Sequence, residues 1–419
     1  MRLRKRLLFG QWLSDTCLAR AFEDVRGSGR QGGEQPSAPG GVGPDPTGSE
    51  GVRAEFEQDS RRRAAGVERN GARAGAGPQT GRAPVTLAQI ARQAGVHVST
   101  VSRALSQDDS VRGGVASGTA TQIRALAEEL GYQRDPAGTA LRTGRSRMLG
   151  VLVPRLTDIV LATVYEGIDA AAATAGYHTV VANTGDDCEM QRRRVDALLA
   201  RRVDGLVLGD ARSDSDLVAE LAGRRIPLVL VSRRLPGRVS VTTDDVRGGR
   251  LAGEHLLDLG HRRAAVVAGE PYASTGVERT RGFLDAFAEA GLPIPESHVV
   301  HSRFDVPGGR AAAEHLLSLR PMPTAVFAVN DFAAIGVMAA VRDAGLTVGG
   351  DVAVVGYNDV ALAAALPVPL TSVRSPMYRM GELAAKTLVN MLEGKPGRSR
   401  RLRPTIVARA STLGVTPQE

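Results

Sequence analysis

The segment from Val98 to Arg103 places hydroxyl groups, a guanidinium group and small apolar side chains within two helical turns. Hydroxyl groups bind phosphate oxygens or base edges, and a guanidinium group can donate two hydrogen bonds to one guanine. A valine side chain can contact the methyl group of thymine. These residue types favour contacts in the major groove of DNA. The candidate DNA-binding residues are Val98, Ser99, Thr100, Ser102 and Arg103 of this segment, together with Thr86 before it.

Two short helices around a glycine turn must position these side chains. Thr86 and Gln89 have the spacing of a capping box, which predicts that a first helix begins at Leu87. Apolar residues then recur with the helical period, at Leu87, Ile90, Ala91 and Ala94. Gly95 suits the turn, and a second helix is predicted from Val98 to Leu105. An ordinary pair of surface helices would share this local pattern. The neighbouring segments must therefore distinguish a DNA-binding helix pair from an ordinary one.

A third helix is predicted from about Thr119 to Leu130, with Gly131 ending it. It completes a three-helix domain over residues 84–134. The residues between the second and third helices are rich in Gly, Ser and Asp, which predicts a loop.

The run VTLAQIARQAGVHVSTVSRAL, from Val85 to Leu105, resembles the DNA-binding headpiece of the lactose/galactose repressor (LacI/GalR-type) family of transcriptional regulators. The resemblance implies that the second helix reads the operator. His97 stands where that family often carries a serine that caps this helix, and the loop after Leu105 is longer than is usual in the family.

Residues 135–146 resemble the hinge segment of the same family. The resemblance implies that this segment forms a short helix on operator DNA and that Leu141 enters the minor groove, where a leucine can unstack a base step. Gly138 departs from the family pattern and raises the cost of ordering the helix by up to about 1 kcal/mol relative to alanine. A plain interdomain linker is the alternative interpretation.

From Met148 onwards, short apolar runs alternate with segments of helical period. This alternation is typical of βαβ units and predicts parallel sheets with helices on both faces. The predicted strands are Leu149–Val153, Thr179–Ala182, Gly205–Leu208, Leu228–Val231, Ala264–Ala268, Ala325–Val329 and Val352–Gly356.

Residues 147–415 resemble the effector-binding and dimerisation core of the family, which is similar to periplasmic sugar-binding proteins. The predicted fold is therefore a small all-α helix-turn-helix headpiece followed by an α/β, periplasmic-binding-protein-like core of two doubly wound parallel-sheet subdomains. We expect one subdomain at about 147–246 plus 375–404 and the other at about 247–374 plus 405–415.

Polar residues follow the predicted strands, and ligands of such sheets bind at the carboxyl ends of the strands. Arg279 in STGVERTRGF matches the arginine that contacts effector in the family, and Asn330 with Asp331 matches its V-N-D element. The candidate effector-binding residues are Ser232, Arg233, Arg279, Phe304, Asn330, Asp331, Asn358 and Met377. For each of them a helix cap or a loop hydrogen bond is the alternative.

Ser232 and Asn358 stand where the family often has aspartate. The loss of two carboxylates slightly favours a negatively charged ligand, although a sugar or sugar derivative remains the expected effector.

The charge of the chain is concentrated towards its beginning. The net charge is +8, and residues 151–419 are almost neutral, with 31 Lys/Arg against 30 Asp/Glu. An excess of positive charge at the DNA-facing end fits a nucleic-acid partner. The two cysteines, Cys17 and Cys188, lack metal-ligand spacing, and no apolar run is long enough for a membrane span. We therefore expect a cytoplasmic, nucleoid-associated protein.

Residues 1–83 are dominated by Gly, Arg, Ala, Pro, Glu and Gln, a composition typical of disorder. We interpret them as a disordered basic extension. The alternative is that they are not translated and that the protein starts downstream, for example at Val67.

Catalytic patterns are missing from the sequence. His255 and His261 do not share a helical face, and the Walker loop, HExxH and Gly-x-Ser-x-Gly motifs do not occur. We therefore expect no enzymatic activity, no cofactor and no metal.

The expected function is that of a sequence-specific transcriptional regulator, most simply a repressor, that binds double-stranded operator DNA as a homodimer or tetramer. A small metabolite between the core subdomains would control its operator affinity. A solute-binding transport receptor would instead carry a signal peptide and no headpiece. A regulator controlled chiefly by a protein corepressor would have a cleft that binds no metabolite.

Overall fold

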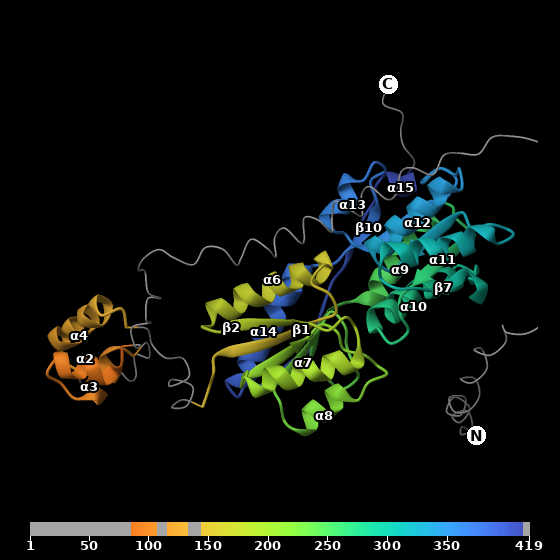
Figure 1. Cartoon of the computed structure of the whole chain (residues 1–419). Coiled ribbons are helices and arrows are strands. Elements are labelled where there is room, and N and C mark those ends of the chain that lie inside the picture. The colour runs from red at the N-terminus through yellow and green to blue at the C-terminus, as the bar shows by residue number, and fades with distance from the viewer. Residues whose placement is uncertain (1–84, 107–114, 133–143, 414–419) are drawn as a thin grey trace, which may run out of the picture. The chain divides into compact units, whose positions relative to one another are not determined.

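A computed structural model describes residues 85–106, 115–132 and 144–413. Within the first two ranges, the headpiece consists of α2 (Leu87–Gln93), α3 (Val98–Ala104) and α4 (Ser117–Glu129) (Figure 1). Ile90, Val101 and Ile123 are fully buried where the three helices meet. The third helix begins two residues before the predicted start, at Ser117, and its N-cap residue Ala116 makes no side-chain capping hydrogen bond.

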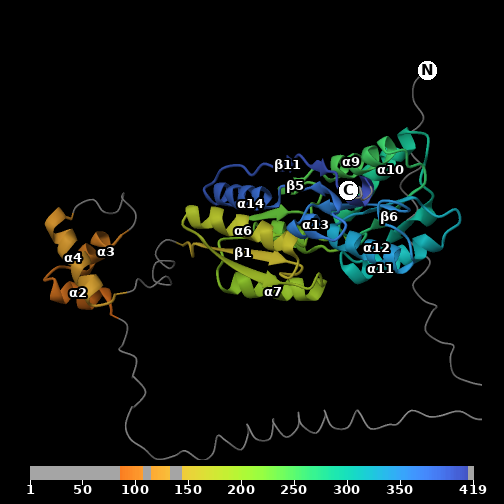
Figure 2. The same cartoon turned by 90° about the horizontal axis from the view of Figure 1, so that it is seen from above.

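The first half of the core forms a sheet, which we call sheet A, whose described strands are all parallel, in the order β11-β5-β4-β3-β1-β2. These strands are β1 (Met148–Val153), β2 (His178–Asn183), β3 (Gly205–Leu208), β4 (Leu228–Val231), β5 (Ser240–Thr243) and β11 (Arg400–Leu402). Helices α6 (Ile159–Thr174) and α14 (Met377–Leu392) cover one face, and α7 (Cys188–Ala200) and α8 (Leu217–Gly223) cover the other. Figure 2 shows β1 between α6 and α7. We call this unit the N subdomain.

A second sheet, sheet B, has the order β12-β10-β9-β8-β6-β7. Its strands are β6 (Ala264–Ala268), β7 (Val299–His301), β8 (Ala325–Ala328), β9 (Ala353–Asn358), β10 (Thr371–Arg374) and β12 (Thr405–Val407). Helices α9 (Asp245–Asp258) and α10 (Ser274–Glu289) pack on one face, and α11 (Val306–Ser318) and α12 (Asp331–Asp343) pack on the other. The predicted fold class is confirmed, except that β12 is antiparallel to β10. We call this unit the C subdomain.

The chain passes between the two subdomains three times within residues 144–413. It crosses between β5 and α9, between β10 and α14, and between β11 and β12. As a result α14, coloured blue, packs among the yellow and green elements of the N subdomain (Figure 1). Three chain connections of this kind can act together as a hinge, about which one subdomain rotates against the other as a rigid body.

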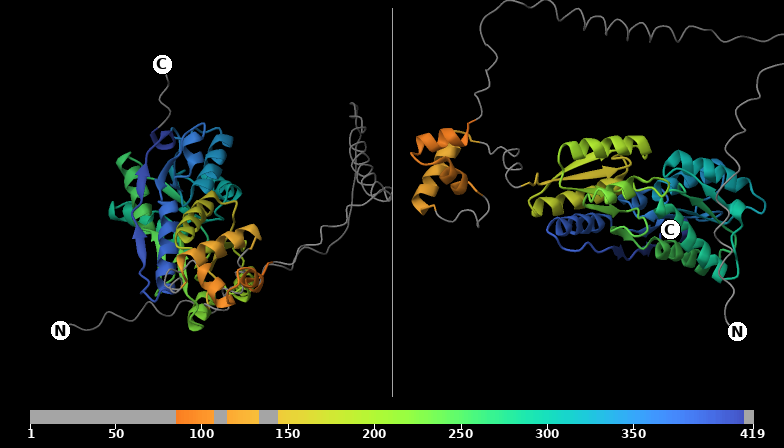
Figure 3. Two further views of the ribbon diagram at one scale, coloured as in Figure 1. Left: turned by 90° about the vertical axis from the view of Figure 1, so that its left-hand side faces the viewer. Right: turned by 90° about the horizontal axis from the view of Figure 1, so that it is seen from below.

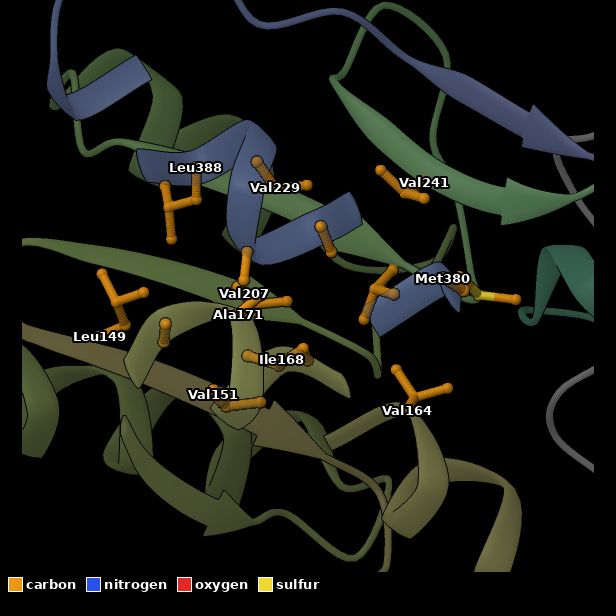
Figure 4. Packing of buried hydrophobic residues seen from close by; sticks show 14 of the residues in the cluster. Leu149, Val151, Val164, Ile168, Ala171, Val207, Val229, Val241, Met380 and Leu388 are labelled. Carbon is orange, nitrogen blue, oxygen red and sulfur yellow. The ribbon is translucent and has the colours of Figure 1, made fainter. Parts of the chain in front are cut away.

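The core of the N subdomain is built from small aliphatic side chains. Leu149, Val151 and Ile168 are fully buried and lie between sheet A and the pair formed by α6 and α14 (Figure 4). The two views of Figure 3 show the same layers from an end and from below. None of the described helices combines the length and apolar character needed to cross a bilayer.

Five short strands were not predicted from the sequence: β5, β7, β10, β11 and β12. They lack the continuous apolar runs of the predicted strands, and β10 carries the polar pair Thr371 and Ser372 in a fully buried position. Their hydroxyl groups are satisfied by partners distant in the sequence, Arg409 and Asp331.

Candidate functional site

The capping box that begins α2 is confirmed. The Thr86 hydroxyl oxygen accepts a hydrogen bond from the Gln89 backbone N–H at 3.3 Å, and Gln89 Oε1 accepts one from the Thr86 backbone N–H at 2.8 Å. These two hydrogen bonds satisfy N–H groups that the first helical turn leaves unpaired. They fix the start of α2, on which α3 packs.

His97 supplies the cap of α3 in place of the serine common in the family. Its Nδ1 atom accepts a hydrogen bond from the Ser99 backbone N–H at 3.3 Å, and the same Nδ1 lies 2.8 Å from the Ser99 hydroxyl oxygen. The substitution therefore keeps the cap, and it adds an imidazole ring at the exposed start of the helix.

The outer face of α3 carries the side chains that the sequence singled out for DNA contacts. Val98 is 39% exposed, and Ser99 and Arg103 are also exposed. Thr100 and Ser102 are half-buried. Arg103 Nε donates to the Ser99 carbonyl oxygen at 3.3 Å, which leaves its terminal nitrogens available for a base or a phosphate. Leu141 and Gly138 lie outside the described residues.

A cavity of about 580 Å³ lies between the two subdomains. It is lined from the N subdomain by residues that follow β1, β2, β3 and β4, and from the C subdomain by residues that follow β6, β7 and β8 and by Asn358, the last residue of β9. Both sheets thus present their carboxyl ends to one space, the usual position of a ligand in this architecture. Its volume lies in the range typical of small-molecule sites.

Six of the eight predicted effector-binding residues line this cavity: Ser232, Arg233, Arg279, Phe304, Asn330 and Asn358. Met377 and Asp331 do not line it. Met377 is the first residue of α14 and packs against the core of the N subdomain. Asp331 is buried behind the cavity wall.

Arg279 is held from several sides. Its Nε donates to Asp245 Oδ1 at 2.7 Å and its Nη1 to the Val329 carbonyl oxygen at 2.8 Å, and its guanidinium lies 3.7 Å from the centroid of the Tyr357 ring. Burial lowers the pKa of Arg279, but the charge of Asp245 more than offsets this effect, so the pKa is raised. The remaining N–H donors are available to a ligand in the cavity.

Arg233 is the second oriented guanidinium of the cavity. Its two terminal nitrogens donate to the two carboxylate oxygens of Asp186, each at 2.7 Å. Burial raises the pKa of Asp186, yet the hydrogen bonds and charge of Arg233 outweigh it, and the pKa is lowered. The two hydrogen bonds to Asp186 hold the buried guanidinium of Arg233 in one orientation, which suits recognition of ligand hydroxyl groups.

Asp331 fixes the loop that presents Asn358. Its two carboxylate oxygens accept hydrogen bonds from the Ser372 hydroxyl, at 2.5 Å, and from the Val360 backbone N–H, at 2.8 Å. Asn358 and Asp359 have φ values of 105° and 56°, a left-handed conformation that is costly for these residues. Asp331 therefore supports a strained loop, and burial raises its pKa to about 7.

Asp158 lines the cavity without having been predicted. It caps α6 by accepting a hydrogen bond from the Val160 backbone N–H at 3.0 Å, and burial raises its pKa. Asp186, Glu270, Tyr272, Arg155, Arg303 and Asp305 were missed as well. They belong to loops with no periodic pattern, and their position after a strand is the signal that could have identified them.

The lining contains four guanidinium groups and four carboxyl groups. They belong to Arg155, Arg233, Arg279, Arg303, Asp158, Asp186, Glu270 and Asp305. The four carboxyl groups offset the guanidinium charges, so Ser232 and Asn358 do not leave an excess of positive charge. The charge of the lining gives no preference for a negatively charged ligand.

The histidines considered as catalytic candidates make structural hydrogen bonds. His255 Nε2 lies 2.9 Å from the Thr412 hydroxyl oxygen, and His261 Nδ1 lies 3.0 Å from the Thr324 hydroxyl oxygen. Burial lowers the pKa of both. Within the described ranges, no group of three His, Cys, Asp or Glu residues is arranged to hold a metal ion.

A helix-turn-helix headpiece joined to a two-subdomain core with a polar cavity defines a class of protein: DNA-binding regulators with a ligand-binding core. Comparisons with known proteins support this class. Residues 86–135 match the family of bacterial regulatory proteins called the lacI family, and residues 254–412 match the periplasmic binding protein-like domain.

The similarity to known proteins extends over almost the full length of those proteins. The chain is 30% identical to the transcriptional repressor PurR of Photobacterium profundum, over 78% of this chain and 98% of that protein. It is 31% identical to the ribose operon repressor of Escherichia coli, over 78% of this chain and 99% of that protein. The chain therefore belongs to the LacI family of bacterial transcriptional regulators.

Solved structures agree with this membership. The Lac repressor dimer bound to operator and an anti-inducer matches with a TM-score of 0.72 at 27% identity, over 79% of this chain and 100% of that one. The complex of the transcriptional regulator CelR with cellobiose matches with a TM-score of 0.60 at 30% identity, over 78% of this chain and 99% of that one.

Proposed function

We propose that this chain is a repressor that binds a pseudo-palindromic operator as a homodimer or tetramer, and that a sugar-like metabolite in the cavity between its subdomains controls operator affinity. The cavity carries this proposal: about 580 Å³, at the carboxyl ends of both sheets, with charged groups of both signs in equal number. The similarity to a repressor bound to operator and to a regulator bound to cellobiose supports it.

A sugar fits the chemistry of the lining. Each hydroxyl group of a sugar both donates and accepts hydrogen bonds, so it can use guanidinium N–H groups together with carboxylate and amide oxygens. Phe304, Phe332 and Tyr272 add apolar ring surface to the same cavity. A neutral polyol matches this mixture better than a ligand with a single strong charge.

On the DNA side, we propose that α3 reads base edges through Val98, Ser99, Thr100, Ser102 and Arg103, and that Thr86 contacts the backbone near the start of α2. Leu141 would enter the minor groove from the hinge. Rotation of one subdomain against the other in each protomer would move the two hinges of a dimer apart, which weakens operator binding.

The effector can be identified by calorimetric titration of the full chain with a panel of monosaccharides, disaccharides and sugar phosphates. We expect one neutral sugar to bind and to change the affinity for operator DNA. Arg279→Lys keeps the charge next to Asp245 but loses the planar fork, and it should weaken sugar binding by about tenfold. Arg281→Lys, at an exposed position of the same helix, is the matched control and should bind sugar normally.

Tight operator binding by a chain that binds no sugar in the panel would contradict control by a sugar. Selective binding of the sugar phosphates would contradict the preference for a neutral ligand.

A further inference from the structure

Tyr272 belongs to the C subdomain but is surrounded by N-subdomain groups. It lies in the loop between β6 and α10, and its carbonyl oxygen accepts hydrogen bonds from the Ser213 backbone N–H at 3.1 Å and from the Ser213 hydroxyl at 3.2 Å. The guanidinium of Arg212 lies 3.4 Å from the centroid of the Tyr272 ring. The loop after β3 thus forms a socket for this one side chain.

The socket is itself fixed by further hydrogen bonds. Arg212 donates two hydrogen bonds to the carboxylate of Asp214, at 2.9 and 2.7 Å, and a third to the Asp186 carbonyl oxygen at 2.7 Å. A guanidinium held in this way provides a rigid cationic surface for an aromatic ring.

The hydroxyl group of Tyr272 connects the socket with the effector cavity. It donates a hydrogen bond to Asp186 Oδ2 at 3.1 Å, the same atom that accepts from Arg233 Nη2 at 2.7 Å. Asp186 therefore joins a side chain of the C subdomain to the guanidinium of Arg233, which lines the cavity. Arg233 and Asp186 are both buried or nearly so, with side-chain exposures of 7% and 14%.

A second contact joins the subdomains beside the socket. The Arg234 backbone N–H donates to the Ser274 hydroxyl oxygen at 2.8 Å, and the Arg234 guanidinium forms an ion pair with Glu278 of α10. We call the contacts of Arg212, Ser213 and Arg234 with Tyr272, Ser274 and Glu278 the rim contact. Arg155 and Asp305, which also line the cavity from opposite subdomains, are 3.7 Å apart, a longer ion pair.

We propose that Tyr272 and Asp186 are positioning residues that couple closure of the rim contact to the orientation of Arg233 in the effector cavity. The proposal rests on the proposed function, because it assigns a role in effector control to Arg233. When the rim contact opens, Tyr272 leaves its socket, and Asp186 loses the hydrogen bond that fixes it opposite Arg233. An effector that binds better when Arg233 is in its paired orientation then favours the closed rim contact. The shift equals the difference between its free energies of binding to the closed and open forms.

The test uses hydrogen exchange in the full chain without DNA or sugar, at the Ser213 and Arg234 amides and at the terminal N–H groups of Arg233. Tyr272→Phe removes only the hydroxyl group and keeps the ring over Arg212. We expect exchange at all three positions to become at least about ten times faster, as loss of one hydrogen bond to a carboxylate implies. Asp186→Asn should accelerate exchange at the terminal N–H groups of Arg233 further, because it also removes the ion pair.

Tyr165→Phe is the matched control, since the Tyr165 hydroxyl also makes a hydrogen bond, to Thr179 within the N subdomain, at 2.8 Å. It should leave all three exchange rates unchanged. Exchange in Tyr272→Phe at the wild-type rate would overturn the proposal, and so would acceleration at Ser213 and Arg234 without a change at Arg233. Because the measurement needs neither operator nor effector, either result leaves the proposed function standing.

Discussion

At the scale of single residues, the wall of the cavity depends on a carboxyl group that does not itself line the cavity. Asp331 is only 1% exposed and accepts hydrogen bonds from Ser372 and from the backbone of Val360. Burial raises its pKa to about 7. The strained loop at Asn358 therefore rests on a group whose protonation changes near neutral pH.

This raised pKa predicts how stability depends on pH. Between the unfolded pKa of 3.8 and the folded pKa of about 7, the folded state binds a proton that the unfolded state does not. The contribution of Asp331 to stability is thus fully present below the lower value and is lost as the pH rises from there through 7. At about 1.4 kcal/mol per pKa unit, the contribution of Asp331 is at most about 4 kcal/mol.

Asp331→Asn should remove this component, because the amide does not titrate. Urea unfolding of both proteins at several values from pH 4.5 to 8 measures it as the difference between their free energies of unfolding. Asp196→Asn, at an exposed position of α7, is the control and should follow the wild type. Parallel curves for the wild type and Asp331→Asn would show that Asp331 does not titrate in this range.

The sequence allowed part of the site to be predicted at this scale. Asn330, Asn358 and Ser232 could be found because each follows an apolar strand. The pairing of Tyr272 with Asp186 could not, because 86 positions separate the two residues and only the approach of two subdomains joins them. The burial of Arg279 against Asp245 was missed for a different reason, because it depends on how α9 and α10 pack together within the C subdomain.

At the scale of elements, the packing of α6 against α14 determines the shape of the N subdomain. An added Cβ at Gly381 would lie 1.9 Å from the Val164 carbonyl oxygen, and one at Gly167 would lie 2.1 Å from the Tyr378 carbonyl oxygen. The two backbones therefore meet at a reciprocal pair of glycines. Any side chain at either position would force the helices apart.

Gly381→Ala should destabilise the core by about 2–3 kcal/mol, the usual cost of overpacking. Gly223→Ala, at the end of α8, is the control, because an added Cβ there has nothing within 4 Å, and alanine is the better helix former. Denaturant unfolding followed by circular dichroism compares the two. Equal stability of Gly381→Ala and the wild type would mean that the helices do not cross this closely.

Strands rich in Val, Leu and Ala were predictable because they are buried on both faces of a parallel sheet. The strand β10 was not, since its sequence TSVR contains hydroxyl groups that become buried only through partners elsewhere in the chain. The strands β7, β11 and β12 have only three residues each and give too short a pattern to recognise.

At the scale of the whole molecule, three chain crossings join two subdomains that enclose the cavity, and the rim contact bridges them beside Arg233. A change of angle between the subdomains would therefore alter the cavity and the rim contact together. The order of headpiece, hinge and core along the chain places the DNA-reading element next to the N subdomain in sequence.

The most direct test of the central claim is selection of DNA by the full chain from a pool of random duplexes, followed by affinity measurements. We predict enrichment of a two-fold symmetric site. Arg103→Ala should weaken binding to this site by about five- to 150-fold, corresponding to roughly 1–3 kcal/mol, with far less effect on unrelated DNA. Arg92→Ala, at an exposed position of α2, should keep the sequence preference. Failure to enrich any site, or an equal loss of affinity for selected and unrelated DNA in Arg103→Ala, would contradict the account.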